Sequence, residues 1–175
     1  MDQHFILSIL SDDKPGIVKQ IAHIVSQHGG SWQESRLTQL AGKFAGVVRI
    51  TLKNDQQTAL SEALERLEDQ QIRVQIENVA HIAPRSAARS ARFSLTGPDR
   101  PGIVLEITQA LASYQINVED LSTHCTSMPY SGEPLFEAEG ILSLPADTNL
   151  DQLTEQLDNI ADELALDIQL EEVRG

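Results

Sequence analysis

The sequence has one cysteine, few aromatic residues and only half as many basic as acidic side chains. The single Cys125 excludes an intrachain disulfide. With 13 basic against 26 acidic residues, the formal net charge is −13. Phosphate backbones require a basic surface, so this charge excludes direct nucleic-acid binding as the main activity. We therefore expect any regulatory effect to pass through another protein.

The sequence also lacks a long hydrophobic run. No stretch reaches the roughly 18 apolar residues that would indicate a membrane-spanning helix. The first residues, 1–7, lack the basic start and the long apolar region of a signal peptide. The sequence therefore predicts a soluble cytoplasmic protein with no membrane partner. Its 175 residues, 41% of them apolar, suffice for one domain or for two small ones.

Charge is distributed unevenly along the chain. Residues 1–83 carry 10 acidic and eight basic side chains, whereas residues 93–175 carry 16 acidic and two basic ones. Two interpretations remain open for this acidic second half: it faces a basic partner, or it keeps the protein soluble by charge repulsion.

A repeat organises the whole chain. The segment Asp13-Lys14-Pro15-Gly16-Ile17-Val18 recurs 86 residues later as Asp99-Arg100-Pro101-Gly102-Ile103-Val104. Ser8 and Ser94 match at the same offset. Self-similarity at one period indicates a duplicated structural unit. We therefore predict a first domain over residues 1–83, a linker rich in small residues over 84–91, and a second domain over 92–175.

Each unit has the pattern strand, helix, strand, strand, helix, strand. The first strands are predicted at 5–10 and 92–96, and each is followed by a proline that suits the first turn of a helix. The next two strands are joined by a turn at Ala41-Gly42 in the first unit and by a loop with six extra residues, within 127–134, in the second. A second amphipathic helix and an alternating strand close each unit. This βαββαβ order predicts an α+β fold: two tandem ferredoxin-like domains, each with two helices on one face of an antiparallel sheet. Sheet edges invite pairing, so the two units could join their sheets side by side or each could pair with a second chain, and we expect a homo-oligomer.

The motif Asp-x-Pro-Gly-Ile-Val at a strand-to-helix turn, present twice in βαββαβ units, resembles the ACT domain, a regulatory module that binds amino acids. Two such domains with nothing attached are similar to the glycine cleavage system transcriptional repressor family. That resemblance implies an accessory, non-enzymatic repressor that binds a small amino acid, glycine foremost, and acts on a DNA-binding transcriptional activator protein. Two alternatives remain: a regulatory subunit of an amino-acid biosynthetic enzyme, and a purely structural dimerisation module.

Physical chemistry gives its own reason for a ligand at this turn. A helix N-terminus presents unpaired N–H groups and partial positive charge, which suit the carboxylate of an amino acid. Gly16 and Gly102 would let the ligand approach the backbone, and Asp13 or Asp99 could pair with its ammonium group. In the alternative interpretation, each aspartate only favours the start of its helix.

The resemblance adds further candidate contacts. The family often uses an asparagine at the start of the second strand, where this sequence has Asn117 in the second unit and Ser31 in the first. Another family contact lies two residues before the aspartate, where the units have Ser11 and Gly97. The sequence-based hypothesis is that the second unit senses the ligand and the first helps assembly. The candidate ligand-binding residues are Ser11, Asp13, Pro15, Gly16, Ile17, Val18, Asp99, Pro101, Gly102, Ile103, Val104 and Asn117.

No catalytic or metal-binding pattern is evident. His124-Cys125 is the only adjacent pair of base and nucleophile, but neighbours along a strand point to opposite faces and cannot form a dyad. The other histidines form no ligand cluster, and there is no Cys-x-x-Cys motif. We therefore predict no enzyme activity, no metal and no cofactor. Trp32, the only tryptophan, is either a core residue or lines the first site.

Overall fold

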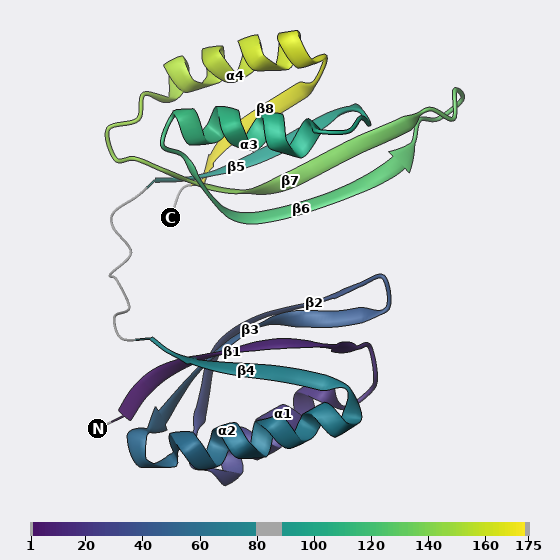
Figure 1. Ribbon diagram of the computed structural model, residues 1–175. Helices are drawn as coiled ribbons and strands as arrows, with labels where there is room; N and C mark the ends of the chain where they lie inside the picture. Colours follow the sequence, from purple (N-terminus) through teal and green to yellow (C-terminus); the bar gives the residue numbers. More distant parts are fainter. Residues whose placement is uncertain (1, 80–88, 174–175) are drawn as a thin grey trace. The chain divides into compact units, whose positions relative to one another are not determined.

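A computed structural model describes residues 2–79 and 89–173 (Figure 1). The chain divides into two compact units, residues 1–83 and 84–175, which we call unit 1 and unit 2. Most of the segment predicted as a linker, 84–88, lies outside the described residues. Each unit is an α+β structure with one four-stranded antiparallel sheet, so the fold class predicted from the sequence is confirmed.

Unit 1 follows the βαββαβ order, with two short 3₁₀ helices flanking its second α-helix. Its elements are β1 (Asp2–Asp12), α1 (Ile17–Gln27), β2 (Ser31–Leu40), β3 (Lys43–Lys53), η1 (Asn54–Gln56), α2 (Gln57–Glu65), η2 (Arg66–Gln70) and β4 (Ile72–Asn78). The strand order in its sheet is β2-β3-β1-β4. Both α-helices lie against one face of this sheet (Figure 1).

Unit 2 repeats this arrangement. Its elements are β5 (Arg89–Pro98), α3 (Ile103–Ser113), β6 (Asn117–Ser127), β7 (Pro134–Leu144), α4 (Leu150–Leu164) and β8 (Asp167–Val173). The strand order is β6-β7-β5-β8, which is equivalent to the order in unit 1. Helices α3 and α4 again cover a single face of the sheet (Figure 1).

Each unit has its own hydrophobic core between helices and sheet. Alternation along β1 buries Phe5, Leu7 and Ile9. Spacings of three and four along α1 bury Ile17 and Ile21 beneath the same sheet. Trp32 is partly buried and packs against this core, which favours the interpretation as a core residue. The acidic side chains of α4 are exposed and form a solvated face; they are Asp151, Glu155, Asp158, Asp162 and Glu163.

Two boundaries differ from the sequence-based expectation. Helices α1 and α3 begin two residues after Pro15 and Pro101, so these prolines lie in the preceding turn rather than in the helix. A left-handed glycine stands between proline and helix in both units, and its conformation is not helical. Strand β5 also begins at Arg89, inside the predicted linker, because Ala91 is small enough to be fully buried while the segment pairs with β7.

The two hairpins differ as the sequence predicts. In unit 1, Ala41 and Gly42 both have positive φ, which is the requirement of a two-residue type I′ turn. In unit 2, Ser127 pairs with Pro134, and residues 128–133 form the extra loop between them. The loop is closed by hydrogen bonds between the backbone groups of Met128 and those of Glu133 and Gly132.

Candidate functional site

The strand-to-helix turn of unit 1 spans residues 13–16, and we call it turn 1. Its start is fixed by a hydrogen bond in which the Asp13 N–H donates to the Gly42 carbonyl over 2.9 Å. Its end is held in place by Ile17, the first residue of α1, whose side chain is buried in the core and only 3% exposed. Gly16 is the N-cap residue of α1, at φ 94°, and no side chain caps the helix. A Cβ built on Gly16 would meet nothing within 4 Å. Turn 1 therefore offers an open helix N-terminus.

Turn 2, residues 99–102, has the same backbone design. The Asp99 N–H donates to the Pro134 carbonyl over 3.1 Å, and Gly102 is the N-cap residue of α3 at φ 91°. Ile103 is buried, whereas Val104, like Val18 in unit 1, is 41% exposed. In both units the motif Pro-Gly-Ile-Val thus places one apolar residue in the core and one at the surface.

The two helix N-termini differ in their charges. Glu106, in the first turn of α3, forms a two-pronged ion pair with Arg100, with N–O distances of 2.9 and 2.5 Å. The hydrogen bond to Arg100 lowers the pKa of the Glu106 carboxyl, and the same bond raises the pKa of Arg100. In unit 1 the equivalent residue is Gln20, and the first turn of α1 has no acidic residue. The N-terminus of α3 therefore already has a carboxylate beside it, whereas that of α1 does not.

Cys125 and His124 have separate partners on opposite faces of β6. His124 Nε2 lies 3.0 Å from Glu137 Oε2. Partial desolvation, and then the charge of the nearby Asp99 carboxylate and its hydrogen bond to the thiol, raise the pKa of Cys125. A raised pKa reduces the thiolate fraction and hence nucleophilicity. The two side chains therefore do not form a dyad with each other.

Asn117 lies at the other end of the sheet from turn 2. It is the first residue of β6 and pairs with Ser143, which pairs in turn with Ser90 near the start of β5. Turn 2 follows the opposite end of β5. Nine residues of extended chain separate Ser90 from Asp99, which corresponds to about 30 Å. Within unit 2, Asn117 and Asp99 therefore cannot contact the same small ligand.

Ser11 and Gly97 have different environments despite their equivalent positions. Ser11 is 4% exposed, and its hydroxyl donates to the Asp12 carbonyl over 3.0 Å. A Cβ on Gly97 would lie 2.3 Å from Cδ2 of Leu166. Gly97 is therefore a packing residue that makes room for the core, whereas Ser11 contributes a polar group.

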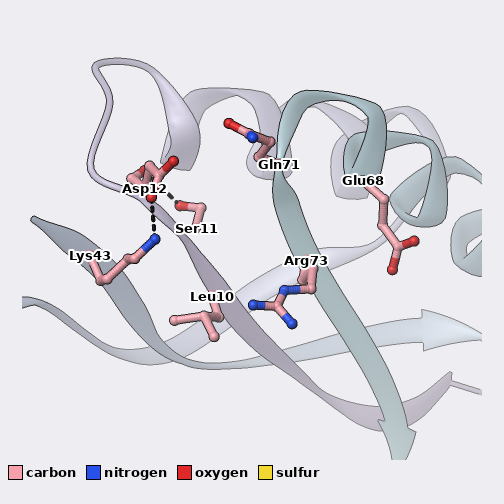
Figure 2. Close-up of a pocket in the computed structure, with 7 residues that line it drawn as sticks. All are labelled: Leu10, Ser11, Asp12, Lys43, Glu68, Gln71 and Arg73. Atoms are coloured by element: carbon pink, nitrogen blue, oxygen red, sulfur yellow. Dashed lines mark hydrogen bonds and ion pairs between the residues drawn. The ribbon is translucent and has the colours of Figure 1, made fainter.

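A cavity of about 480 Å³ lies next to turn 1, and the sequence did not reveal it (Figure 2). We call it the unit 1 cavity. Its lining comes from the end of β1, the start of β3 and the connection from η2 to β4: Leu10, Ser11, Asp12, Lys43, Glu68, Gln71 and Arg73. Of the candidate residues from the sequence, it includes Ser11 alone.

An ion pair between Lys43 Nζ and Asp12 Oδ1 closes one end of the unit 1 cavity (Figure 2). The hydrogen bond from Lys43, and then its charge, lower the pKa of the Asp12 carboxyl. Lys14, which follows in turn 1, has its Nζ 3.5 Å from the side-chain oxygen of the lining residue Gln71. Oppositely charged and polar groups therefore surround an open space, an arrangement that suits a charged small molecule.

Neither a metal site nor a membrane-spanning helix is found within residues 2–79 and 89–173. No group of three or more His, Cys, Asp or Glu side chains in that part of the chain could hold a metal ion. No helix there is long and apolar enough to cross a membrane.

The fold and the two turns define a class of protein: a tandem pair of ferredoxin-like units, each with an open glycine-capped turn between its first strand and first helix. Family comparison agrees, because the ACT domain family matches residues 3–77 and again residues 91–162. The chain therefore belongs to the ACT domain family, with one domain in each unit.

Two solved structures are similar to the chain over its whole length. A protein of unknown function from Galdieria sulphuraria is 27% identical, with a TM-score of 0.82 and coverage of 99% of this chain and 100% of that chain. A protein described as a candidate glycine cleavage system transcriptional repressor is 21% identical, with a TM-score of 0.77 and coverage of 100% and 99%. A formyltetrahydrofolate deformylase from Pseudomonas syringae is 28% identical over 50% of this chain and 28% of its own, with a TM-score of 0.41. No protein of curated function matches the sequence.

Proposed function

We propose that this protein is a non-enzymatic regulator that binds a small amino acid, with glycine as the first candidate, and modulates transcription by contacting a DNA-binding activator protein. The observation that carries the proposal is the pair of glycine-capped turns, each with an open helix N-terminus that no side chain caps. Backbone N–H groups and the helix dipole there favour a carboxylate. The two ACT domain matches, over residues 3–77 and 91–162, support a regulatory function.

The ligand is proposed to bind at turn 1 or turn 2, through the glycines and the adjacent aspartates. Asp13 and Asp99 stand at the start of their turns, where either carboxylate could pair with the ammonium group of the ligand. The side chain that follows in the helix, Val18 or Val104, is half-exposed and would contact the aliphatic part of the ligand. Because Glu106 places a carboxylate beside turn 2, turn 1 is the better site for the ligand carboxylate.

The proposed partner is a protein because the charge of this chain disfavours DNA. The net charge is −13, and residues 93–175 carry most of the excess. A DNA-binding activator has basic surface that an acidic partner could recognise. The full-length similarity to a protein described as a candidate transcriptional repressor supports the same class of function. Each unit also presents two edge strands, β2 and β4 in unit 1 and β6 and β8 in unit 2, through which copies of the chain could pair.

The proposal is tested by calorimetric titration of the full chain with each of the twenty amino acids. We expect saturable heat with glycine or another small amino acid, and binding at least tenfold weaker in Asp13→Ala than in wild type. Asp55→Ala is the matched control, because Asp55 is an exposed acid in η1, away from the turn. If no amino acid binds, the protein is a structural module instead; if Asp99→Ala weakens binding and Asp13→Ala does not, the working turn is turn 2.

A further inference from the structure

We propose that the unit 1 cavity is a separate binding site for a small organic carboxylate, with Arg73 as the direct partner of the carboxylate group. Arg73 is exposed on β4 and lines the cavity together with Leu10, which pairs with it across the sheet (Figure 2). None of the ion pairs among the described residues involves Arg73. A guanidinium that has no ion-pair partner can bind a carboxylate through two parallel N–H···O hydrogen bonds.

The surrounding groups carry charges of both signs, since the Asp12 and Glu68 carboxylates line the cavity together with the cations. Lys43 lines the same cavity, and Lys14 lies at its rim through the contact with Gln71. Because Asp12 is already paired with Lys43, it opposes an incoming anion less than a free carboxylate would. The side-chain NH₂ of Gln71 offers an uncharged donor to a ligand, since Lys14 contacts only the side-chain oxygen of Gln71.

The size and shape of the cavity also fit a small organic ligand. Ligand sites in proteins span about 300–1,000 Å³, and the cavity measures about 480 Å³. Leu10 is 40% exposed and supplies an apolar wall against which a short carbon chain could pack. The lining is thus apolar in part and charged at defined points, which is typical of sites that orient a small metabolite.

Unit 2 provides an internal comparison. Leu10 pairs with Arg73 in unit 1, and the equivalent Thr96 pairs with Asp167 in unit 2, so an acid replaces the arginine. At the end of the first strand of unit 1, Asp12 pairs with Lys43. At the equivalent place in unit 2, Pro98 pairs with Leu135. Both cations are therefore absent from a unit with the same fold. The fold therefore does not require these two cations, and Arg73 is left available to a ligand.

The proposed carboxylate site is distinct from turn 1, because none of the residues from Asp13 to Val18 lines the cavity. It therefore does not depend on the proposed amino-acid site. The two sites are adjacent, however, since Ser11 and Asp12 directly precede the turn. Each can be removed by its own substitution, so binding at one can be measured without the other.

The test is an NMR titration of the full-length protein with three probes: succinate, L-glutamate and inorganic phosphate. We expect succinate or glutamate to shift the Arg73 Nε–Hε signal and the Ser11 and Gln71 amide signals in a saturable way. We expect Arg73→Gln to weaken this binding at least tenfold, because the two guanidinium N–H bonds are lost. Lys43→Gln should also weaken it, since Asp12 then remains as an unpaired acid.

Arg92→Gln is the matched control, because Arg92 is an exposed arginine on β5 of unit 2 and lines a cavity with Asp120 and Glu139. This variant should bind like wild type, and dispersed amide spectra would show that each variant folds. Three results would overturn the proposal: no saturable shift at the cavity with either carboxylate, equal binding by Arg73→Gln and wild type, or tighter binding of phosphate than of both carboxylates. Glycine binding at turn 1 should persist in Arg73→Gln, which separates this proposal from the proposed function.

Discussion

The exposed ion pair between Asp12 and Lys43 is a measurable feature at the scale of a single residue. Lys43 lowers the pKa of Asp12 first through a hydrogen bond and then through its charge, while Lys14 contributes the smallest effect. We predict that Lys43→Gln raises the pKa of Asp12 towards its ordinary value of about 3.9. An NMR pH titration of the carboxyl carbon measures this shift. Lys14→Gln is the control and should raise the pKa less; an equal effect of both variants would contradict the direct bond.

The same pair predicts a sign for the pH dependence of stability. A carboxyl whose pKa is lower in the folded than in the unfolded state stabilises the protein above the unfolded value. That contribution is lost as the pH falls through the lowered pKa of Asp12. Because both side chains are well exposed, solvent screening keeps the contribution small. The pKa itself is therefore the better observable than the unfolding midpoint.

Gly16 and Gly102 have a purely conformational role in the fold. Both have φ in the left-handed region, and a Cβ at Gly16 would meet nothing within 4 Å. We predict that Gly16→Ala and Gly102→Ala each lower the free energy of unfolding by about 1 kcal/mol, which is the cost of an alanine in this region. Urea unfolding measures the effect. Similar losses in both variants would show that the two turns are equivalent as structure, whatever their ligands.

At the scale of elements, the close packing of the edge strand β6 on β7 requires a glycine at position 140. The register of β6 on β7 shifts between Val118 and Asp120. A Cβ on Gly140 would lie 2.1 Å from the Asp120 carbonyl oxygen and 2.7 Å from the Phe93 ring. Backbone and a core ring cannot both move aside, so the glycine allows β6 to lie close to β7.

We predict that Gly140→Ala lowers the free energy of unfolding by about 3 kcal/mol, at the upper end of the usual cost of overpacking. Gly132→Ala is the control for space: unlike Gly140, Gly132 has a positive φ, and its Cβ would meet nothing within 4 Å. Only the conformational cost of about 1 kcal/mol should remain there. Chemical denaturation measures the free energy of unfolding of both variants. Equal decreases would mean that the sheet adapts to the extra methyl group at Gly140.

The sequence predicted the elements well because their signals are local. Alternation in β1 and spacings of three and four in α1 depend only on neighbouring residues, and both elements form. The helix starts were two residues too early, because the prediction treated Pro15 as helical and overlooked the left-handed Gly16. The bulges were not predicted either, since they depend on the register between strands.

The candidate site was predicted in part for the same reason. Turn 1 and turn 2 are contiguous segments, so the repeated motif is sufficient to locate them. The unit 1 cavity combines Ser11, Lys43 and Arg73 from three separate strands, and only the pairing of β1 with β3 and β4 brings them together. The separation of Asn117 from Asp99 likewise follows from strand direction, which a single motif does not contain.

At the scale of the whole molecule, duplication preserved the fold and changed the charges. Residues 93–175 carry 16 acidic and two basic side chains, while the basic residues of unit 1 nearly balance its acids. Positions that hold Lys43 and Arg73 in unit 1 hold Leu135 and Asp167 in unit 2. The two units thus differ strongly in charge although they share one fold.

This charge distribution leads to the prediction that the protein alone does not bind DNA. DNA affinity requires several free cations on one surface, and unit 1 has more of them, with eight basic residues against five in unit 2. Two of its cations are already paired, because Arg49 lies 3.2 Å from Glu34 and Lys43 contacts Asp12. The remaining positive charge faces the repulsion of an acidic chain with a net charge of −13.

We therefore expect no retardation of duplex DNA in a gel-shift experiment at physiological salt, with the protein at micromolar concentration and with or without glycine. The same experiment with a DNA-binding activator present should show a change in the activator complex, because contact with the activator is the proposed route of action. Arg36→Gln combined with Arg73→Gln removes two cations from unit 1 and serves as the control for residual electrostatic binding. A salt-sensitive shift of sub-micromolar affinity by the protein alone, lost in that double variant, would show that unit 1 binds DNA directly and that the net charge is a poor guide to its surface.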